Sequence, residues 1–459
     1  MTDVVMSSSD AAPGTREGTP KRRWRRWWLY PLGLVLVALV AWGLWNRSLS
    51  SELSREIAKI RARGEPVTFA ELAPAPVDPD DDATEIVLTA LNKIQQRPFN
   101  DILAVEPPLA GDKLDTLRQA IAANQGQLDG IAQGLRRPHF RLPLDYTDPM
   151  PMPAVLTLIK DFRTINRVLR AQILVALAEG ETDVATDSVL LGLRVGERLR
   201  DEPLLIVQLL RTAMGTSSLR ELQLLLGERP LPPAQRDLLR QQLATIEADL
   251  SLRRWFLRER ALVNTSMAYL PTAALTGAGR PPGFLRMVLR LPVQGLFDAQ
   301  RAQMLRTLTE VAEIADVTGP EGDEAVAELE ARIVELPDFF NLIKLQLPAL
   351  VQARTAGLRY RQRLRLALIA IHLDASRREG QLPNRLEDAL DPSTTNLALG
   401  IFSDKPIRYQ ATDDAFLLYN LGPNGHDDGI DEATGQRLDE NEVTFQVRYR
   451  TPAKETSDE

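Results

Sequence analysis

Near the C-terminus, one glycine-rich stretch, Gly422–Asp431 (GPNGHDDGID), gathers side chains that can bind a metal ion. Calcium takes about six to eight oxygen ligands from carboxylates, amides and backbone carbonyls. The glycines of the stretch let the backbone turn its carbonyl groups inward. We therefore expect a calcium site with four side-chain ligands, which are Asn424, Asp427, Asp428 and Asp431. The alternative is a solvated turn, because Asn-Gly and Asp-Gly pairs form turns without any ion.

Other groups that could carry out catalysis are sparse. The chain has no cysteine, which excludes thiol catalysis and cysteine-bound zinc, and its three histidines lie far apart in the sequence. Two carboxylates on either side of a cleft are enough for glycoside hydrolysis. A hydrolase is therefore one alternative function, and its candidate acids are Asp145, Asp148, Asp427 and Asp428.

The composition is that of a globular protein with enough apolar residues for a hydrophobic core. Of the 459 residues, 44% are hydrophobic and 25% are charged. The net charge is -7 at pH 7, and this argues against a nucleic-acid partner, because phosphate contacts need a basic surface. We therefore expect no nucleic-acid partner.

The element that would position these groups in the cell is an uncharged segment at 27–45 (WWLYPLGLVLVALVAWGLW). As a helix it spans about 28 Å, close to the hydrocarbon thickness of a bilayer. Aromatic residues stand at both ends, and a cluster of lysines and arginines at 21–26 precedes it. We predict a single-pass transmembrane anchor, with residues 1–26 as a disordered cytoplasmic tail and the remaining chain extracytoplasmic. A cleaved signal peptide is the alternative, although Gly43–Arg47 lacks the small residues of a cleavage site.

Between the anchor and residue 350 the sequence pattern is helical. Residues 46–82 are expected to form a stalk and a proline-rich linker, and residues 83–350 a helical domain. Apolar residues recur at three- and four-residue steps, which predicts an array of stacked amphipathic helices. One turn, Ala176–Ala185, resembles a tetratricopeptide hairpin, in which small residues bring two helices together and Gly180 ends the first.

Two stretches of this array have specific predicted boundaries. After the break at Pro230–Pro233, the pattern predicts one long helix over 233–263. Further along, it predicts separate helices at 339–349 and 358–378, and the sequence pattern changes after Val351.

Toward the C-terminus, strand patterns replace helix patterns. Residues 407–409 and 415–419 flank a turn, and residues 443–449 alternate apolar and polar side chains with a period of two. We predict an α+β module over 351–450, with a helix on a short antiparallel sheet, and a disordered tail at 451–459. The predicted fold class is mostly α, with one N-terminal transmembrane helix, an extracytoplasmic helical array and this small module.

Three sequence segments of the module resemble the globular head of type II secretion major pseudopilins. They are REGQLP at 378–383, SDKPIRY at 403–409 and FLLYNLGPNGHDDG at 416–429. Similar tails also occur on uncharacterised membrane-anchored bacterial proteins. The resemblance implies a bacterial envelope protein with a calcium-holding loop at 422–431. The anchor lacks the prepilin cleavage signature and the apolar start with a glutamate that pilin helices use to assemble, so we do not expect a pilus subunit.

The sequence favours a non-enzymatic role. Stacked amphipathic helices without an acid–base or nucleophile motif predict a scaffold or protein-interaction protein. We expect it in the bacterial inner membrane, with the lipid bilayer and a protein of the cell envelope as its partners. The alternatives are an envelope hydrolase and a secretion-system accessory that docks pilin-like partners. Apart from calcium, no cofactor is expected.

Overall fold

The computed structural model describes residues 29–228, 230–276, 294–337, 341–377, 382–390, 394–412, 415–421 and 443–449. Most of these residues are helical, and one three-stranded antiparallel sheet lies near the C-terminus. The predicted fold class is therefore confirmed: it is mostly α, with one N-terminal apolar helix and a small sheet.

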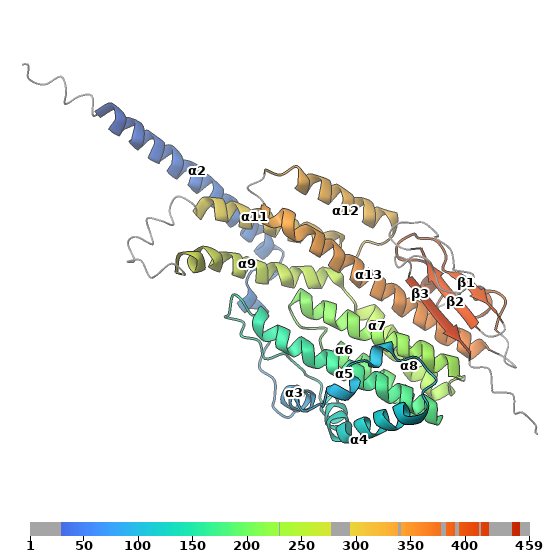
Figure 1. Ribbon diagram of the computed structural model, residues 1–459. Helices are drawn as coiled ribbons and strands as arrows, with labels where there is room; N and C mark the ends of the chain where they lie inside the picture. The colour runs from blue at the N-terminus through green and yellow to red at the C-terminus, as the bar shows by residue number, and fades with distance from the viewer. Residues whose placement is uncertain are drawn as a thin grey trace, which may run out of the picture.

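The first helix, α2, runs without a break over Leu29–Ala62 and projects from the rest of the chain (Figure 1). Over 30–45 its apolar side chains are exposed, with Tyr30 76% exposed and Trp45 47% exposed. By length and composition α2 can cross a membrane, and among the described residues it is the one helix that can. A membrane anchor and a signal sequence both fit this observation.

The polar half of α2 packs against α11 (Gln294–Ile314). A small apolar cluster joins the two helices and includes Leu53, Ile60, Ala302 and Leu305. The Arg306 guanidinium contacts the Glu56 carboxylate, with an Nη2–Oε1 distance of 3.1 Å. The helical stalk predicted from the sequence is therefore the continuation of the apolar helix, and it is docked on the body of the protein.

The next helices stack one after another. They are α3 (Thr84–Asn92), α4 (Gly111–Gly134), α5 (Met152–Glu179), α6 (Thr182–Glu197), α7 (Leu205–Glu228) and α8 (Pro233–Asp249). Helix α5 packs against α4, α6 and α7, and α6 packs against α7 and α8. The apolar residues of α5 recur at three- and four-residue steps, and almost all of them are buried in these contacts. Alternate helices thus form two layers. We call the layer of α4, α6 and α8 the front layer and the layer of α5 and α7 the rear layer.

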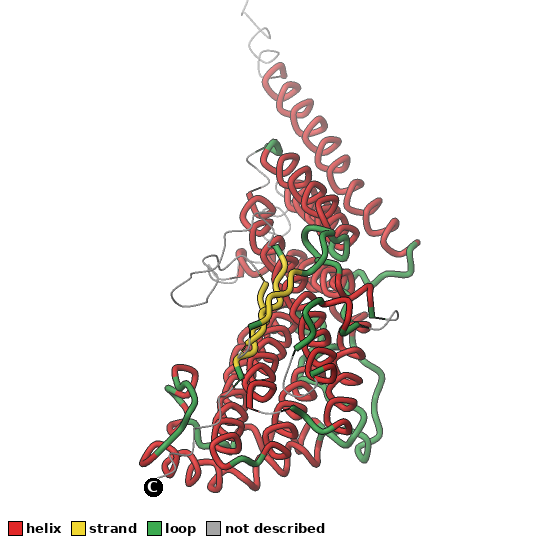
Figure 2. Tube along the Cα trace, turned by 90° about the vertical axis from the view of Figure 1, so that its right-hand side faces the viewer, coloured by secondary structure: helices red, strands yellow, loops and turns green. Residues whose placement is uncertain are grey.

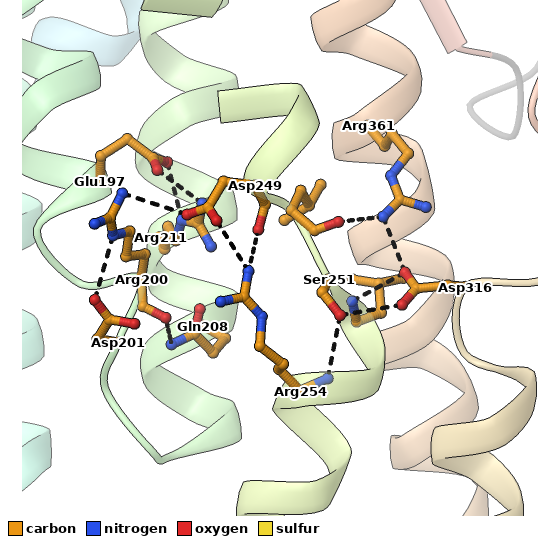
Figure 3. Close-up of polar contacts among 12 residues, drawn as sticks. Glu197, Arg200, Asp201, Gln208, Arg211, Asp249, Ser251, Arg254, Asp316 and Arg361 are labelled. Atoms are coloured by element: carbon orange, nitrogen blue, oxygen red, sulfur yellow. Dashed lines mark hydrogen bonds and ion pairs between the residues drawn. The ribbon is translucent and has the colours of Figure 1, made fainter. Parts of the chain in front are cut away.

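The predicted single helix over 233–263 is wrong, because the chain breaks between α8 and α9 (Leu252–Thr276). The start of α9 is capped by a residue that is distant in the sequence. The Asp316 carboxylate accepts the Leu252 N–H at 3.0 Å and the Arg253 N–H at 3.1 Å. Figure 3 shows this carboxylate at the start of α9. This part of the cap comes from elsewhere in the chain and leaves no local signal in the sequence, whereas the Ser251 hydroxyl, which accepts the Arg254 N–H at 3.4 Å, is a local cap.

The prediction of two helices at 339–349 and 358–378 is also wrong. After α12 (Gly319–Val334), helix α13 runs continuously over Asn341–Ser376, with Pro348 inside it. Proline lacks an N–H and disfavours a helix interior. That local cost is outweighed because α13 packs against α7, α8, α11, α12 and the sheet, which buries most of its apolar side chains.

The strands of the C-terminal sheet are β1 (Arg408–Ala411), β2 (Ala415–Asn420) and β3 (Val443–Arg448). They pair antiparallel in the order β1-β2-β3 and lie together against the helices (Figure 2). Residues of β3 are alternately buried and partly exposed, as their period of two predicted. The sheet packs on α13 and α7.

One apolar core joins the helices to the sheet. It extends from Ile173 in α5 to Val447 in β3 and includes the buried Trp255 of α9. The predicted boundary between residues 83–350 and 351–450 falls inside α13, in the middle of this core. The division of the chain at that point stays a prediction.

Candidate functional site

The predicted calcium loop lies outside the described residues. Its four expected ligands are Asn424, Asp427, Asp428 and Asp431. Within the part of the chain that the structure describes, no group of three or more histidine and acidic side chains is arranged to hold a metal ion. The calcium site at Gly422–Asp431 therefore stays a prediction.

The two hydrolase candidates of the helical region shape a turn before α5. Asp145 accepts hydrogen bonds from the Thr147 N–H at 2.8 Å and from the Thr147 hydroxyl at 2.6 Å. These bonds hold the pKa of Asp145 below its usual value. Asp148 accepts the Met150 N–H at 2.8 Å. The structure thus gives both carboxylates a local role, and neither lines the groove between α4 and α6.

A groove of about 1130 Å³ runs along the front layer between α4 and α6. One face of each helix lines it: α4 contributes Leu128 and Ala132, and α6 contributes Val184 and Leu191. Helix α5 packs against both flanking helices. The loop after α4 closes one end of the groove with Phe140 and its neighbours.

The two flanking helices run in the same direction. At their N-terminal ends, Arg118 of α4 contacts Glu179, which lies just before α6, with an Nη2–Oε1 distance of 2.6 Å. At their C-terminal ends, the Arg198 guanidinium donates hydrogen bonds to the carbonyl groups of Leu135 and Pro138. These contacts join residues that are 60, 61 and 63 positions apart in the sequence. A position of α4 therefore lies within about one turn of helix of the α6 position 58 residues later.

Each side of the groove carries an aspartate and, seven residues later, an arginine. On one side these are Asp129 in α4 and Arg136 just after it, and on the other side Asp187 and Arg194 in α6. Seven residues of helix rise about 10 Å. Because the helices are parallel, one end of the groove is acidic and the other end is basic.

All four of these side chains are exposed, and three of them have no partner among the described residues. Within the described residues, the side chains of Arg136, Asp187 and Arg194 form neither an ion pair nor a hydrogen bond. Asp129 accepts one hydrogen bond from the Gln125 amide at 2.8 Å. A charged side chain without a partner can pair with a group of opposite charge at little cost in desolvation, since it is exposed.

Other charged side chains near the basic end are already paired, as Figure 3 shows. The Glu197 carboxylate contacts Arg211 of α7, with an Nη2–Oε2 distance of 2.7 Å. Arg200 contacts Asp201 at 3.2 Å and Asp249 of α8 at 3.3 Å. These pairs tie α6 to the two helices beside it, so the wall of the groove is held in place.

Arg198 adds positive charge to the basic end. Burial lowers the pKa of Arg198, and the like charges of Arg200 and Arg194 lower it further. An anion bound at this end would relieve the repulsion among the three guanidinium groups. The basic end is therefore suited to a carboxylate or another small anion.

Glu202 is buried at the basic end, with 3% of its surface exposed. One carboxyl oxygen accepts the Leu142 N–H at 2.7 Å, and the other, Oε2, has no hydrogen-bond partner within the described residues. Burial raises the pKa of Glu202 to about 7, against the Leu142 hydrogen bond and the charge of Arg141. Near neutral pH this carboxyl group can therefore either accept or donate a hydrogen bond to a ligand.

The loop that closes the basic end is held by backbone hydrogen bonds. The His139 N–H donates to the Asp81 carbonyl at 3.1 Å, and the His139 carbonyl accepts the Ala83 N–H at 2.8 Å. Tyr146 of the same loop stacks on Phe69, with 4.9 Å between ring centroids. Burial raises the pKa of Tyr146 to about 12, so its hydroxyl stays neutral.

Sequence reasoning missed the charged side chains that line this groove. A signal was present, because Asp129 and Arg136 have the same seven-residue spacing as Asp187 and Arg194. The spacing alone does not say that the two segments face each other. That juxtaposition depends on the contacts of α5 with both helices, which lie beyond any local pattern.

No protein-family model, no curated protein and no solved structure matches the chain. The resemblance of residues 378–429 to pseudopilin heads therefore stays a prediction.

Proposed function

We propose that the protein is a membrane-anchored scaffold or interaction protein that holds a partner protein in the groove between α4 and α6. In this proposal the anchor lies in the bacterial inner membrane, the N-terminus is cytoplasmic, and the helical region lies on the outer side. The partner belongs to the cell envelope, and no catalytic step takes place. The observation that carries the proposal is a groove whose walls present charges of both signs, such as Asp187 and Arg194, that have no partner among the described residues.

The architecture around the groove supports this role. Stacked helices whose alternate members line one concave surface are a common way to bind an extended partner. A volume of about 1130 Å³ is large for a small-molecule site, which typically measures about 300–1,000 Å³. The groove lies between two parallel helices, so a chain segment can follow its length.

The position of the body next to α2 supports a retained anchor. The Asn46 side chain accepts the Gly295 N–H at 2.7 Å, and the Ser50 hydroxyl donates to Asp298 at 2.8 Å. These contacts begin directly after Trp45, where the apolar run ends. With 27–45 in a bilayer, the helical body would be fixed near the membrane surface.

Photocrosslinking in living cells tests the proposal. A photoreactive amino acid is placed at Ala132 or Val184, which line the groove, or at Leu156, an exposed residue of α5 outside it. We expect the same protein adduct from both groove positions and no such adduct from Leu156. The full-length protein in its own membrane is used, and the adduct is identified by mass spectrometry.

Two results would contradict the proposal. Groove positions that give no adduct, in protein that is expressed and folded, would leave the groove without a partner. An identical adduct from Leu156 would mean that the contact does not depend on the groove. A pilin-like adduct would favour the special case in which the chain serves a secretion system.

An envelope hydrolase is the second candidate function, and one observation favours it. Two adjacent carboxyl groups in the groove have pKa values moved in opposite directions, as an acid and a base often do. Burial raises the pKa of Glu202 to about 7. Burial would also raise the pKa of Asp201, but hydrogen bonds from Arg200 and Arg258 bring it below its usual value. Asp201 is held by those arginines, so we prefer the binding role.

A further inference from the structure

We infer that the groove receives an extended polypeptide segment that carries a basic residue and an acidic residue three positions apart. The inference rests on the proposed function and specifies what the partner must present. The acidic residue of the segment contacts Arg136 and Arg194, and its basic residue contacts Asp129 and Asp187.

The spacing follows from the geometry of the flanking helices. Asp187 and Arg194 are seven residues apart, and so are Asp129 and Arg136 on the other side. Each interval corresponds to about 10 Å along a helix axis. An extended chain advances about 3.3 Å per residue, so three residues cover the same distance.

The middle of the groove fits uncharged residues between the two charged ones. The walls between the acidic and basic ends include Ala132, which lies between Asp129 and Arg136, and Leu191, which lies between Asp187 and Arg194. These apolar groups gain by contact with small apolar side chains and would leave an additional charge unpaired. The two intervening residues of the segment are therefore small or apolar.

Unpartnered polar groups in the groove point to a peptide backbone. Glu202 is buried, lines the groove and leaves its Oε2 without a hydrogen-bond partner within the described residues. The amides of Gln172 and Gln242 also line the groove and form no hydrogen bond there with any described residue. A backbone supplies N–H donors and C=O acceptors in alternation, which matches a carboxyl oxygen and two amides.

The presence of both signs of charge excludes simpler ligands. A uniformly acidic ligand would match Arg136 and Arg194 but would meet like charge at Asp129 and Asp187. A uniformly basic ligand would match Asp129 and Asp187 but would meet like charge at Arg136 and Arg194. Complementarity along the whole groove therefore requires a segment with one charge of each sign, and this arrangement also rejects other partners.

The test measures the binding of fluorescein-labelled synthetic peptides to the full chain in detergent micelles by fluorescence anisotropy. The first peptide places one glutamate and one arginine three positions apart in an alanine background. Its isomer has the same composition with the two charges adjacent, and a third peptide carries glutamate at both positions. We expect the first peptide to bind about tenfold more tightly than either of the others.

Variants of the groove make the test specific. Two double variants each remove one end: Arg136→Gln with Arg194→Gln, and Asp129→Asn with Asp187→Asn. Each double variant is expected to weaken the binding of the first peptide by about tenfold, so that this peptide no longer binds more tightly than its isomer. A matched control on exposed residues outside the groove, Arg97→Gln with Asp101→Asn, should bind like the wild type. Circular dichroism confirms that each variant is folded.

Equal binding of the first peptide and its isomer would overturn the inference, and so would undetectable binding of all three. Tightest binding of the all-glutamate peptide would also overturn it and would point to a polyanion. The proposed function is judged separately, because a crosslinked partner at Ala132 and Val184 does not depend on the charges of the peptides.

Discussion

The Glu221→Ala variant is expected to lose about 3–5 kcal/mol of folding free energy, because the change removes the buried anionic partner of the Arg170 guanidinium. The two side chains are 4% and 9% exposed, and their Nη1–Oε1 distance is 2.7 Å. The other carboxylate near Arg170, that of Glu106, is 4.0 Å away and exposed. The pair joins α5 to α7 in the layer behind the groove. Arg170 also donates hydrogen bonds to the carbonyl groups of Ile102 and Val105, just before α4. The variant is therefore expected to destabilise the packing of α4, which lines the groove.

Urea unfolding of the full chain in detergent, followed by far-ultraviolet circular dichroism, measures this effect. Glu221→Gln keeps an acceptor for Arg170 and should cost less than the alanine change. The exposed ion pair of Arg118 and Asp115 provides the control, since Asp115→Ala should leave the unfolding curve unchanged. An unchanged curve for Glu221→Ala would show that the buried pair does not stabilise this packing.

The Glu202→Gln variant is expected to lack a pH dependence of about 3 kcal/mol that the wild-type protein shows. Burial raises the pKa of Glu202 from 4.5 to about 7 on folding. Because the folded-state pKa is the higher one, the stabilising contribution is complete below pH 4.5. It is lost as the pH rises through 7, when folding must keep a charged carboxylate buried.

The difference in unfolding free energy between wild type and Glu202→Gln, measured from pH 5 to pH 8, isolates this group. The subtraction cancels the contribution of Asp374, whose pKa burial raises to about 6. Asp201→Asn serves as the control, because the lowered pKa of Asp201 makes its contribution decrease as the pH falls. Parallel stability profiles for wild type and Glu202→Gln would contradict the assignment of a buried, titrating carboxyl group at the groove.

Features that depend on local periodicity could be predicted from the sequence. The stripe of α5 repeats at three- and four-residue steps, and its residues are buried where the period places them. The helix ends at Gly180, whose φ of 75° lies in the left-handed region that glycine adopts easily. The alternation in β3 likewise predicted which of its residues are buried.

Features that depend on distant partners could not be predicted. The break between α8 and α9 is capped by Asp316, more than sixty residues further along the chain. Helix α13 continues through Pro348 because its neighbours bury it. The groove depends on the parallel placement of α4 and α6 against α5, and the sequence does not encode that placement in any single segment.

The candidate site differs from the sites that the sequence brought forward. Asp145 and Asp148 stabilise a turn, and the predicted calcium loop at Gly422–Asp431 lies outside the described residues. Each charged residue that lines the groove, taken alone, is typical of a solvated helix surface. In the proposed function they act together, because the charged sides of α4 and α6 face the same groove.

In the proposed function, the groove faces the extracytoplasmic side of a membrane to which the chain remains anchored. The chain has no cysteine, so a single one can be introduced without background, at Ala132 in the groove or at Ser7 before the anchor. Intact spheroplasts are treated with a membrane-impermeant maleimide. We expect labelling at Ala132→Cys in the membrane fraction, and labelling at Ser7→Cys only after lysis. Labelling of Ser7→Cys in intact spheroplasts with Ala132→Cys protected, or release of the labelled chain into the soluble fraction, would contradict the claim.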